Sequence, residues 1–305
     1  MSFRFKNKVL MGSVFCIAAA CLWGVSGAAG QYLFNGAGIT PEWLVSTRTL
    51  FTGLFLLTMY QMKHGGVFEI WLNKEDRQGI VIFTLGGMLF MQYGYFAAIK
   101  YCNAATATVL QYTAPIMIVV YLALRTRKLP TLVECIAVAG CLLGTILLAT
   151  HGDMKNLSLS PLALFWGLLS AVALAFYTIY PTRLLMKYNT MYLIGWSMLI
   201  GSVVMHFVHP SWEYAANWDI PSVICMIFIV VLGTMTPYLL FLNGVKYIGP
   251  TKSSLYASAE PLASTIVSVV WLKVGLELID YVGFILIVVA VLMLSFVKPK
   301  QTKKE

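Results

Sequence analysis

Charged side chains are scarce in this sequence. Asp, Glu, Lys and Arg make up 11% of its 305 residues, whereas a typical soluble domain contains about 25%. Hydrophobic residues make up 59%, against about 45–50% in soluble domains, and the mean hydropathy is +0.80. Since a soluble core could not absorb this apolar surplus, the composition excludes a soluble globular protein and indicates an integral membrane protein.

Cysteine and histidine are also sparse, with six and four residues. The cysteines lie within or at the edge of apolar runs and show no paired spacing typical of zinc or redox sites: Cys16, Cys21, Cys102, Cys135, Cys141 and Cys225. The sequence has no Ser-His-Asp spacing, metal-ligand cluster or phosphate-binding loop. We therefore expect no disulfide, no metal, no cofactor and no enzymatic activity, with an intramembrane enzyme as a distant alternative.

Acidic residues number 12 against 21 Lys and Arg, which gives a net charge of +9. The basic residues lie mainly in short segments between apolar runs, and such segments are enriched in Lys and Arg on the cytoplasmic side. With the N-terminus inside, seventeen of the 21 are cytoplasmic, Lys100, Lys155 and Lys273 are outside, and Arg48 lies within a run. We therefore expect both termini in the cytoplasm, contact with membrane lipid and no nucleic-acid partner.

Apolar runs of about 20 residues, long enough to cross a bilayer as a helix, fill most of the chain. They cover residues 9–32, 41–62, 78–99, 103–124, 131–150, 161–182, 190–208, 221–244, 250–272 and 278–297. An odd number of spans per half forces the two halves to enter the membrane from opposite sides. The sequence predicts an all-α membrane protein with ten transmembrane helices, as two inverted five-helix repeats (5+5) around a central cavity: residues 1–150, a connecting loop 151–160, and residues 161–305 with a basic tail.

A partial internal repeat supports this division. Few positions are identical between the halves, but the matching features keep their order and spacing. An offset of 146 residues aligns Lys100-Tyr101 with Lys246-Tyr247, Pro115 with Pro261, Gly87 with Gly233, and Glu134 with Asp280. We expect Pro115 and Pro261 to break their helices, either as simple bends or, since the breaks fall at matching places, in the wall of a cavity.

Two charges lie deep within apolar runs. Glu260 is the only such carboxylate, and an ionisable group there is a functional candidate; it could carry a coupling proton, or it could hold the break at Pro261 by a hydrogen bond. Arg48 is the only such cation and stays charged. For Arg48 we favour static pairing or snorkelling, with binding of a substrate carboxylate as the alternative.

Polar and aromatic side chains are numerous on several of the apolar runs. A binding pocket needs apolar walls and a few aimed polar groups, although such residues also form interface belts and interhelical hydrogen bonds. The candidate substrate-binding residues are Trp23, Gln92, Tyr95, Gln111, Tyr112, Tyr177, Tyr238, Asn243 and Tyr256. Gly24, Gly27 and Gly30 predict close helix packing on the first run.

Several of these segments together resemble the EamA-type transporters of the drug/metabolite transporter superfamily. They are Leu22-Trp23-Gly24, Arg48 after Thr40-Pro41, Ala104 to Pro115, and Ser253 through Glu260-Pro261. The resemblance implies a basket in which spans 1, 3, 4, 6, 8 and 9 surround the substrate cavity and spans 5 and 10 pack outside. It also implies export of small metabolites such as amino acids, driven by a proton or cation gradient.

The sequence therefore predicts a secondary transporter of the bacterial cytoplasmic (inner) membrane that exports small solutes by alternating access. The mixture of aromatic and amide residues favours amino acids or similar amphipathic solutes. A passive facilitator or an importer is the alternative, and a non-transporting scaffold is a distant one. The oligomeric state, coupling ion and particular solute stay open.

Overall fold

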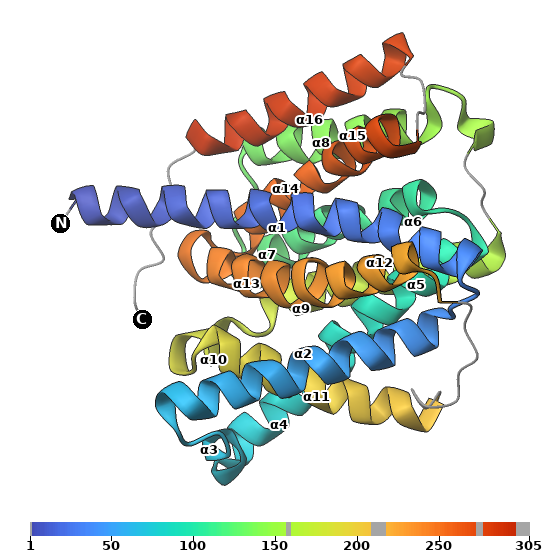
Figure 1. Cartoon of the computed structure of the whole chain (residues 1–305). Helices are drawn as coiled ribbons and strands as arrows, with labels where there is room; N and C mark the ends of the chain where they lie inside the picture. The colour runs from blue at the N-terminus through green and yellow to red at the C-terminus, as the bar shows by residue number, and fades with distance from the viewer. Residues whose placement is uncertain (1, 157–159, 209–217, 273–276, 297–305) are drawn as a thin grey trace.

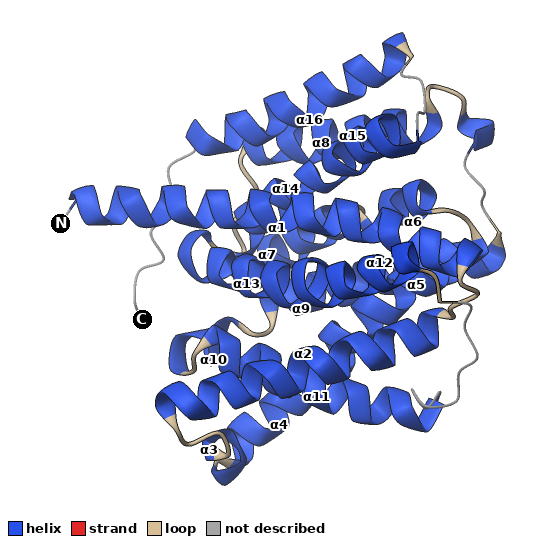
Figure 2. Cartoon of the chain, in the orientation of Figure 1, coloured by secondary structure: helices blue, strands red, loops and turns tan. Residues whose placement is uncertain are grey.

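A computed structural model describes residues 2–156, 160–208, 218–272 and 277–296 of the chain. Every regular element in these ranges is a helix (Figure 2), which confirms the all-α prediction. The α-helices are α1 (Ser2–Gly36), α2 (Pro41–His64), α3 (Glu69–Leu72), α4 (Lys74–Phe83), α5 (Phe90–Tyr101), α6 (Ala104–Gln111), α7 (Ala114–Thr126), α8 (Leu132–Thr150), α9 (Pro161–Ile179), α10 (Thr182–Lys187), α11 (Thr190–Val208), α12 (Ile220–Val230), α13 (Thr236–Ile248), α14 (Pro250–Tyr256), α15 (Glu260–Leu272) and α16 (Leu278–Phe296).

Seven helical stretches of the described residues are long and apolar enough to cross a membrane. They are Lys8–Gly36, Lys74–Tyr101, Thr106–Thr126, Leu132–Thr150, Pro161–Lys187, Thr190–Val208 and Ile220–Ile248. Three of the ten predicted spans are not among them. The span at 41–62 falls on α2, which carries buried Ser, Thr and Arg side chains; the span at 250–272 is interrupted between α14 and α15; and Leu278–Met293 is a shorter apolar helix.

Helix boundaries follow local sequence signals. Thr40 caps α2, with Pro41 in the first turn, and Ser160 caps α9, with Pro161 in the first turn. Each of these side chains accepts a backbone N–H that has no partner within the helix, and proline fits the first turn because it needs no such bond. Thr131 at the start of α8 forms a reciprocal capping box with Glu134.

The element boundaries repeat at the same offset of 146 residues. Helix α8 covers 132–150 and α16 covers 278–296. Single π-helical turns occur at Thr84–Leu89 and at Val231–Met235, and these turns contain the aligned glycines Gly87 and Gly233. Helix α6 ends at Gln111, before Pro115, and α14 ends at Tyr256, before Pro261. The repeat therefore extends from sequence features to the irregularities of the backbone.

Corresponding elements also pack reciprocally. Helix α1 packs on α13, and their counterparts α9 and α5 pack on each other. Helix α2 packs on its own counterpart α11, as α8 does on α16, and both pairs lie side by side in Figure 1. A two-fold relation between the halves would give this pattern, in which each helix of one half and its counterpart in the other half have corresponding packing partners.

Glycines permit the closest of these contacts. A Cβ atom added to Gly53 on α2 would lie 2.7 Å from the Leu199 backbone nitrogen and 3.0 Å from its Cα on α11. Because backbone atoms cannot rotate away, we expect Gly53→Ala to destabilise the protein by about 1–3 kcal/mol, measured as a lower thermal midpoint in detergent. Gly36→Ala is the control, since its Cβ would meet only Tyr32 Cζ at 4.0 Å. An equal effect of both changes would contradict tight α2–α11 packing.

A buried carboxylate connects the two halves at one end of the molecule. Asp76, in the first turn of α4, is fully buried. Its carboxylate accepts hydrogen bonds from Tyr188 Oη at 2.9 Å, Arg183 Nη2 at 3.2 Å and Lys187 Nζ. Arg183 and Lys187 belong to α10, and Arg183 also donates to the exposed Glu75. The start of α4 is therefore held to α10 by charge-assisted hydrogen bonds.

Candidate functional site

An internal pocket lies between the two halves of the chain. Helices α1, α2, α5, α6, α9 and α13 contribute to its lining. The remaining lining residues are the one directly after α6, one in the turn before α15, and the first residue of α15. The peripheral helices α8 and α16 contribute no residue to it. The lining residues are Trp23, Ser26, Gly27, Arg48, Met91, Gln92, Tyr95, Phe96, Gln111, Tyr112, Leu174, Tyr238, Ala257 and Glu260. This wall is mainly apolar and aromatic, and it includes one cation and one carboxylate.

Arg48 forms the positive side of the pocket. The side chain projects from α2 and is 3% exposed. Its Nε and Nη2 atoms donate to Gln92 Oε1 at 3.0 and 2.6 Å, and Nη2 lies 3.5 Å from Tyr238 Oη. The guanidinium carbon lies 4.9 Å from the centre of the Phe96 ring, a cation–π geometry. The guanidinium is therefore fixed from α5 and α13.

Glu260 forms the negative side. It is 5% exposed and stands at the start of α15, after a 3₁₀ turn over Ala257–Ala259. Its Oε2 atom lies 3.1 Å from Tyr112 Oη, which also donates to the Ala257 carbonyl. A hydroxyl has one proton to donate, so Tyr112 serves one of these two acceptors at a time. If Glu260 were protonated, its carboxyl could donate to Tyr112 Oη while Tyr112 donates to the Ala257 carbonyl, so both hydrogen bonds would form.

The amides and hydroxyls around the pocket are held by other helices. Gln111 Nε2 donates to Ser170 Oγ at 2.6 Å, and Ser170 in turn donates to the Met91 carbonyl at 2.8 Å. The Tyr95 hydroxyl lies 3.0 Å from Thr108 Oγ1. These bonds connect α5, α6 and α9 and fix the direction of the side chains that face the pocket.

Trp23 differs because its indole nitrogen has no hydrogen-bond partner among the described residues. Its indole ring meets Tyr238 edge-on at 5.2 Å between centroids and lies 5.3 Å from Phe241. The Nε1 atom is buried and makes no hydrogen bond within the described residues. Indole N–H groups normally find an acceptor when buried, so this donor is available to a bound group.

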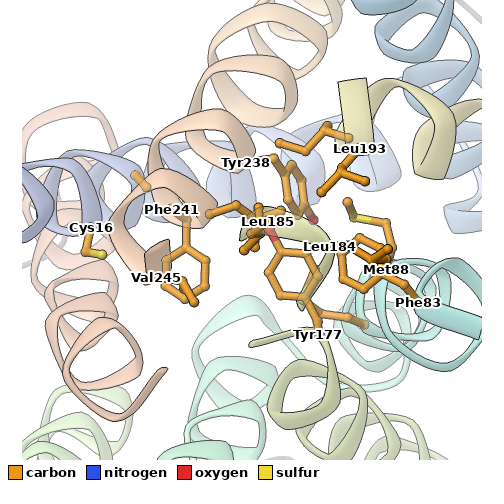
Figure 3. Close-up of a cluster of buried hydrophobic side chains, with 14 of the residues drawn as sticks. Cys16, Phe83, Met88, Tyr177, Leu184, Leu185, Leu193, Tyr238, Phe241 and Val245 are labelled. Carbon is orange, nitrogen blue, oxygen red and sulfur yellow. The ribbon is translucent and has the colours of Figure 1, made fainter. Parts of the chain in front are cut away.

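A cluster of aromatic and aliphatic side chains fills the space next to Tyr238 (Figure 3). Tyr177 meets Tyr238 edge-on at 5.8 Å between centroids and stacks on Phe241 at 6.0 Å. Phe83 stacks on Tyr177 from α4, at 5.5 Å. Tyr177 therefore packs within this cluster, and its hydroxyl makes no hydrogen bond in the described part of the chain.

Six of the nine residues expected to bind substrate line this pocket together with both buried charges: Trp23, Gln92, Tyr95, Gln111, Tyr112 and Tyr238. The other three do not. Tyr177 lies in the aromatic cluster, Tyr256 is buried on α14, and the Asn243 amide accepts from Thr190 and donates to the Leu239 carbonyl.

Sequence reasoning missed other lining residues: Ser26, Gly27, Met91, Phe96, Leu174 and Ala257. Ser26 and Gly27 could have been found, because positions three and four after Trp23 share its helix face. Phe96 is four residues after Gln92 and could have been found in the same way. Leu174 and Ala257 stand three residues before the candidates Tyr177 and Glu260, so the same rule could have found them.

An all-helical membrane protein with an internal pocket that carries opposite charges is the class that the fold and the site define. The chain belongs to the EamA-like transporter family, which it matches over residues 10–150 and 161–296. This confirms the resemblance seen in the sequence, and the chain is a membrane transporter of that family.

Individual relatives agree with this assignment. The chain is 37% identical over 286 residues to an uncharacterized inner membrane transporter, YicL of Salmonella typhimurium, covering 93% of this chain and 95% of YicL. It is 24% identical to the uncharacterized transporter YdfC of Bacillus subtilis, over 77% of this chain and 75% of YdfC. A crystal structure of a protein with 16% identity has a similar fold, with a TM-score of 0.74 over 93% of this chain and 96% of that chain.

Proposed function

We propose that the protein is a secondary transporter that exports small metabolites across the bacterial cytoplasmic membrane by alternating access. Amino acids and similar amphipathic solutes are the favoured cargo. The observation that carries the proposal is the pocket, which draws its walls from both family repeats and places Arg48 and Glu260 in one buried, largely aromatic site. Polar groups aimed into apolar walls are typical of sites for small molecules.

The architecture that we propose has ten membrane helices in two inverted repeats, residues 1–150 and 161–305, with both termini cytoplasmic. Support comes from the shared offset of 146 residues between α8 and α16, between the two π-helical turns, and between the two helix interruptions. The reciprocal packing of α1 on α13 and α9 on α5 fits the same two-fold relation. Broken helices at matching places point to a binding site between the repeats.

Glu260 is the proposed coupling group. An ionisable side chain inside a membrane helix marks a proton or ion pathway, and Tyr112 and the Ala257 carbonyl provide a geometry that accepts the carboxyl with a proton. In the proposed cycle, Glu260 takes up a proton when the pocket faces one side and releases it on the other. Arg48 keeps its charge throughout.

Flux through purified protein in proteoliposomes tests the proposal. We expect a labelled amino-acid mixture to move across the vesicle membrane faster than in empty liposomes, and an imposed pH gradient to drive accumulation. For one proton per solute, a gradient of one pH unit supports a concentration ratio of about ten, because one unit corresponds to about 1.4 kcal/mol. Solute flux that does not depend on the pH gradient would indicate a passive facilitator. Absence of flux for amino acids and other small metabolites would overturn transport.

A further inference from the structure

Among the described residues, no opposite charge pairs with the Arg48 guanidinium. Ion pairs in the described part of the chain join His151 to Asp280, and Arg183 and Lys187 to Glu75 and Asp76, but none includes Arg48. Glu260 shares the pocket with Arg48 and is not within ion-pair distance of it. An uncompensated charge in a buried site is strongly destabilising. The guanidinium is held instead by one amide oxygen, one distant hydroxyl and an aromatic face.

Its hydrogen bonds are also incomplete. A guanidinium has five N–H donors in a planar fork, and those of Arg48 used within the described residues come from Nε and Nη2. The Nη1 atom makes no hydrogen bond there. Gln92 is itself fixed, since its Nε2 donates to the Met88 carbonyl at 3.3 Å. Arg48 is therefore held in position with part of its fork free.

A second unused donor belongs to Trp23, a residue of α1 that lines the same pocket. The Trp23 Nε1 atom is buried without a partner, and Trp23 contacts Tyr238, the residue whose hydroxyl lies beside Arg48. Each of these unused groups is a donor only. The matching ligand must therefore bring acceptor oxygens, and the charge of Arg48 requires that they carry a negative charge.

We propose that Arg48 is the specificity-determining residue of the pocket and binds the carboxylate of the transported solute, with Trp23 Nε1 as an additional donor. Gln92 and Tyr238 are positioning residues that hold the guanidinium fork toward the pocket. A carboxylate accepts two parallel N–H bonds from a guanidinium, which combines charge with geometric selection. The inference rests on the proposed transport function and assigns its substrate class: solutes that carry a carboxylate, whether or not they also carry an amine.

Four probes that share the isobutyl side chain of leucine test the assignment on the purified full chain. L-leucine and 4-methylpentanoate carry a carboxylate, whereas L-leucinamide and 3-methylbutylamine lack it. Isothermal titration is expected to show binding of the two carboxylates and binding of the amide and amine at least about tenfold weaker. This comparison uses the unaltered protein and needs no variant to fold. Equal binding of all four probes, or binding of none, would overturn the assignment.

Variants locate the selectivity. Arg48→Gln is expected to weaken carboxylate binding about 10- to 100-fold. It should not weaken amine binding, because the change removes a positive charge from the pocket. Trp23→Phe keeps a ring but removes the indole donor, and a loss of about three- to tenfold for the carboxylates alone is expected. Arg125→Gln is the control, because Arg125 is exposed on α7, outside the pocket. Retained carboxylate preference in Arg48→Gln would place the anion site elsewhere.

Flux measurements separate this inference from the transporter proposal. Vesicles that transport the amine but reject both carboxylates would contradict the role of Arg48 and leave transport in place. Carboxylate binding that depends on Arg48, combined with no flux of any of the four probes or of other small metabolites, would contradict transport and leave the binding site in place.

Discussion

Proteoliposomes that contain Glu260→Gln are expected to lose solute accumulation driven by a pH gradient. The wild-type protein should reach a concentration ratio of up to about ten for each pH unit, whereas the variant should equilibrate its solute to a ratio near one. The reason is chemical: the amide nearly matches the carboxyl in size and can still meet Tyr112, but it cannot exchange a proton. Solute counterflow, which needs no net proton movement, is expected to persist in the variant.

A matched control separates coupling from simple loss of a carboxylate. Glu42 lies at the start of α2 and accepts a hydrogen bond from Tyr93 Oη at 2.9 Å, so it resembles Glu260 in having a tyrosine partner but does not line the pocket. Glu42→Gln should accumulate solute as the wild type does. If Glu260→Gln retained full gradient-driven accumulation, Glu260 would not be the coupling group.

Much of the helical layout could be predicted because a membrane helix requires a run of about 20 apolar residues, which is visible in the sequence. Where polar side chains face the interior, that signal weakens. Helix α2 buries Ser46, Thr47, Arg48, Thr49 and Thr52. These polar side chains lower its hydropathy, so α2 is not among the seven long apolar stretches although the sequence predicts a span over 41–62. The polar face that lowers the hydropathy of α2 also carries Arg48, which lines the pocket.

The pocket could be anticipated in part, since Arg48 and Glu260 are the two charges deep within apolar runs and both line it. Helix phase decides which of them face inward, and the sequence does not fix how each helix is rotated against its neighbours. Tyr177 and Tyr238 look equivalent in the sequence, yet Tyr177 packs against Phe83 and Phe241 while Tyr238 reaches Arg48. Such differences depend on contacts between segments distant in the chain.

Arg48 illustrates the other kind of limit. A lone arginine in an apolar run must find an acceptor, and the sequence alone favours static pairing or snorkelling without naming the partner. In the structure its partners are Gln92, Tyr238 and the Phe96 ring, which come from α5 and α13 and whose approach to α2 depends on the tertiary packing. Whether a buried charge is satisfied by the protein or left for a ligand can be read only from the assembled site.

Replacing Asp76 with Asn is expected to shift the protein toward a conformation in which the ends of α4 and α10 are separated. Asp76 is fully buried, while the side chains of Lys187 and Arg183 are 50% and 67% exposed. We therefore expect the substitution to destabilise the conformation in which α4 and α10 are joined, by about 2 kcal/mol, near the lower end of the range for charged hydrogen bonds. This change shifts a two-state equilibrium about 30-fold. Spin labels at the exposed positions Leu72 and Met186, in a chain with its exposed cysteines Cys21 and Cys135 replaced by serine, would report the separated population as a longer distance.

Glu75→Gln is the control for this shift. Glu75 is next to Asp76 and pairs with the same Arg183, at 2.9 Å, but its side chain is 76% exposed. Exposed ion pairs contribute about 0–1 kcal/mol, so this change should leave the distance distribution nearly unaltered. In the proposed alternating-access cycle, one end of the pocket must open while the other stays closed, and the Asp76 network is suited to hold its end closed because it joins one repeat to the other. Unchanged distances in Asp76→Asn, with the protein still folded, would show that the aromatic cluster around Tyr177 holds this end without the network.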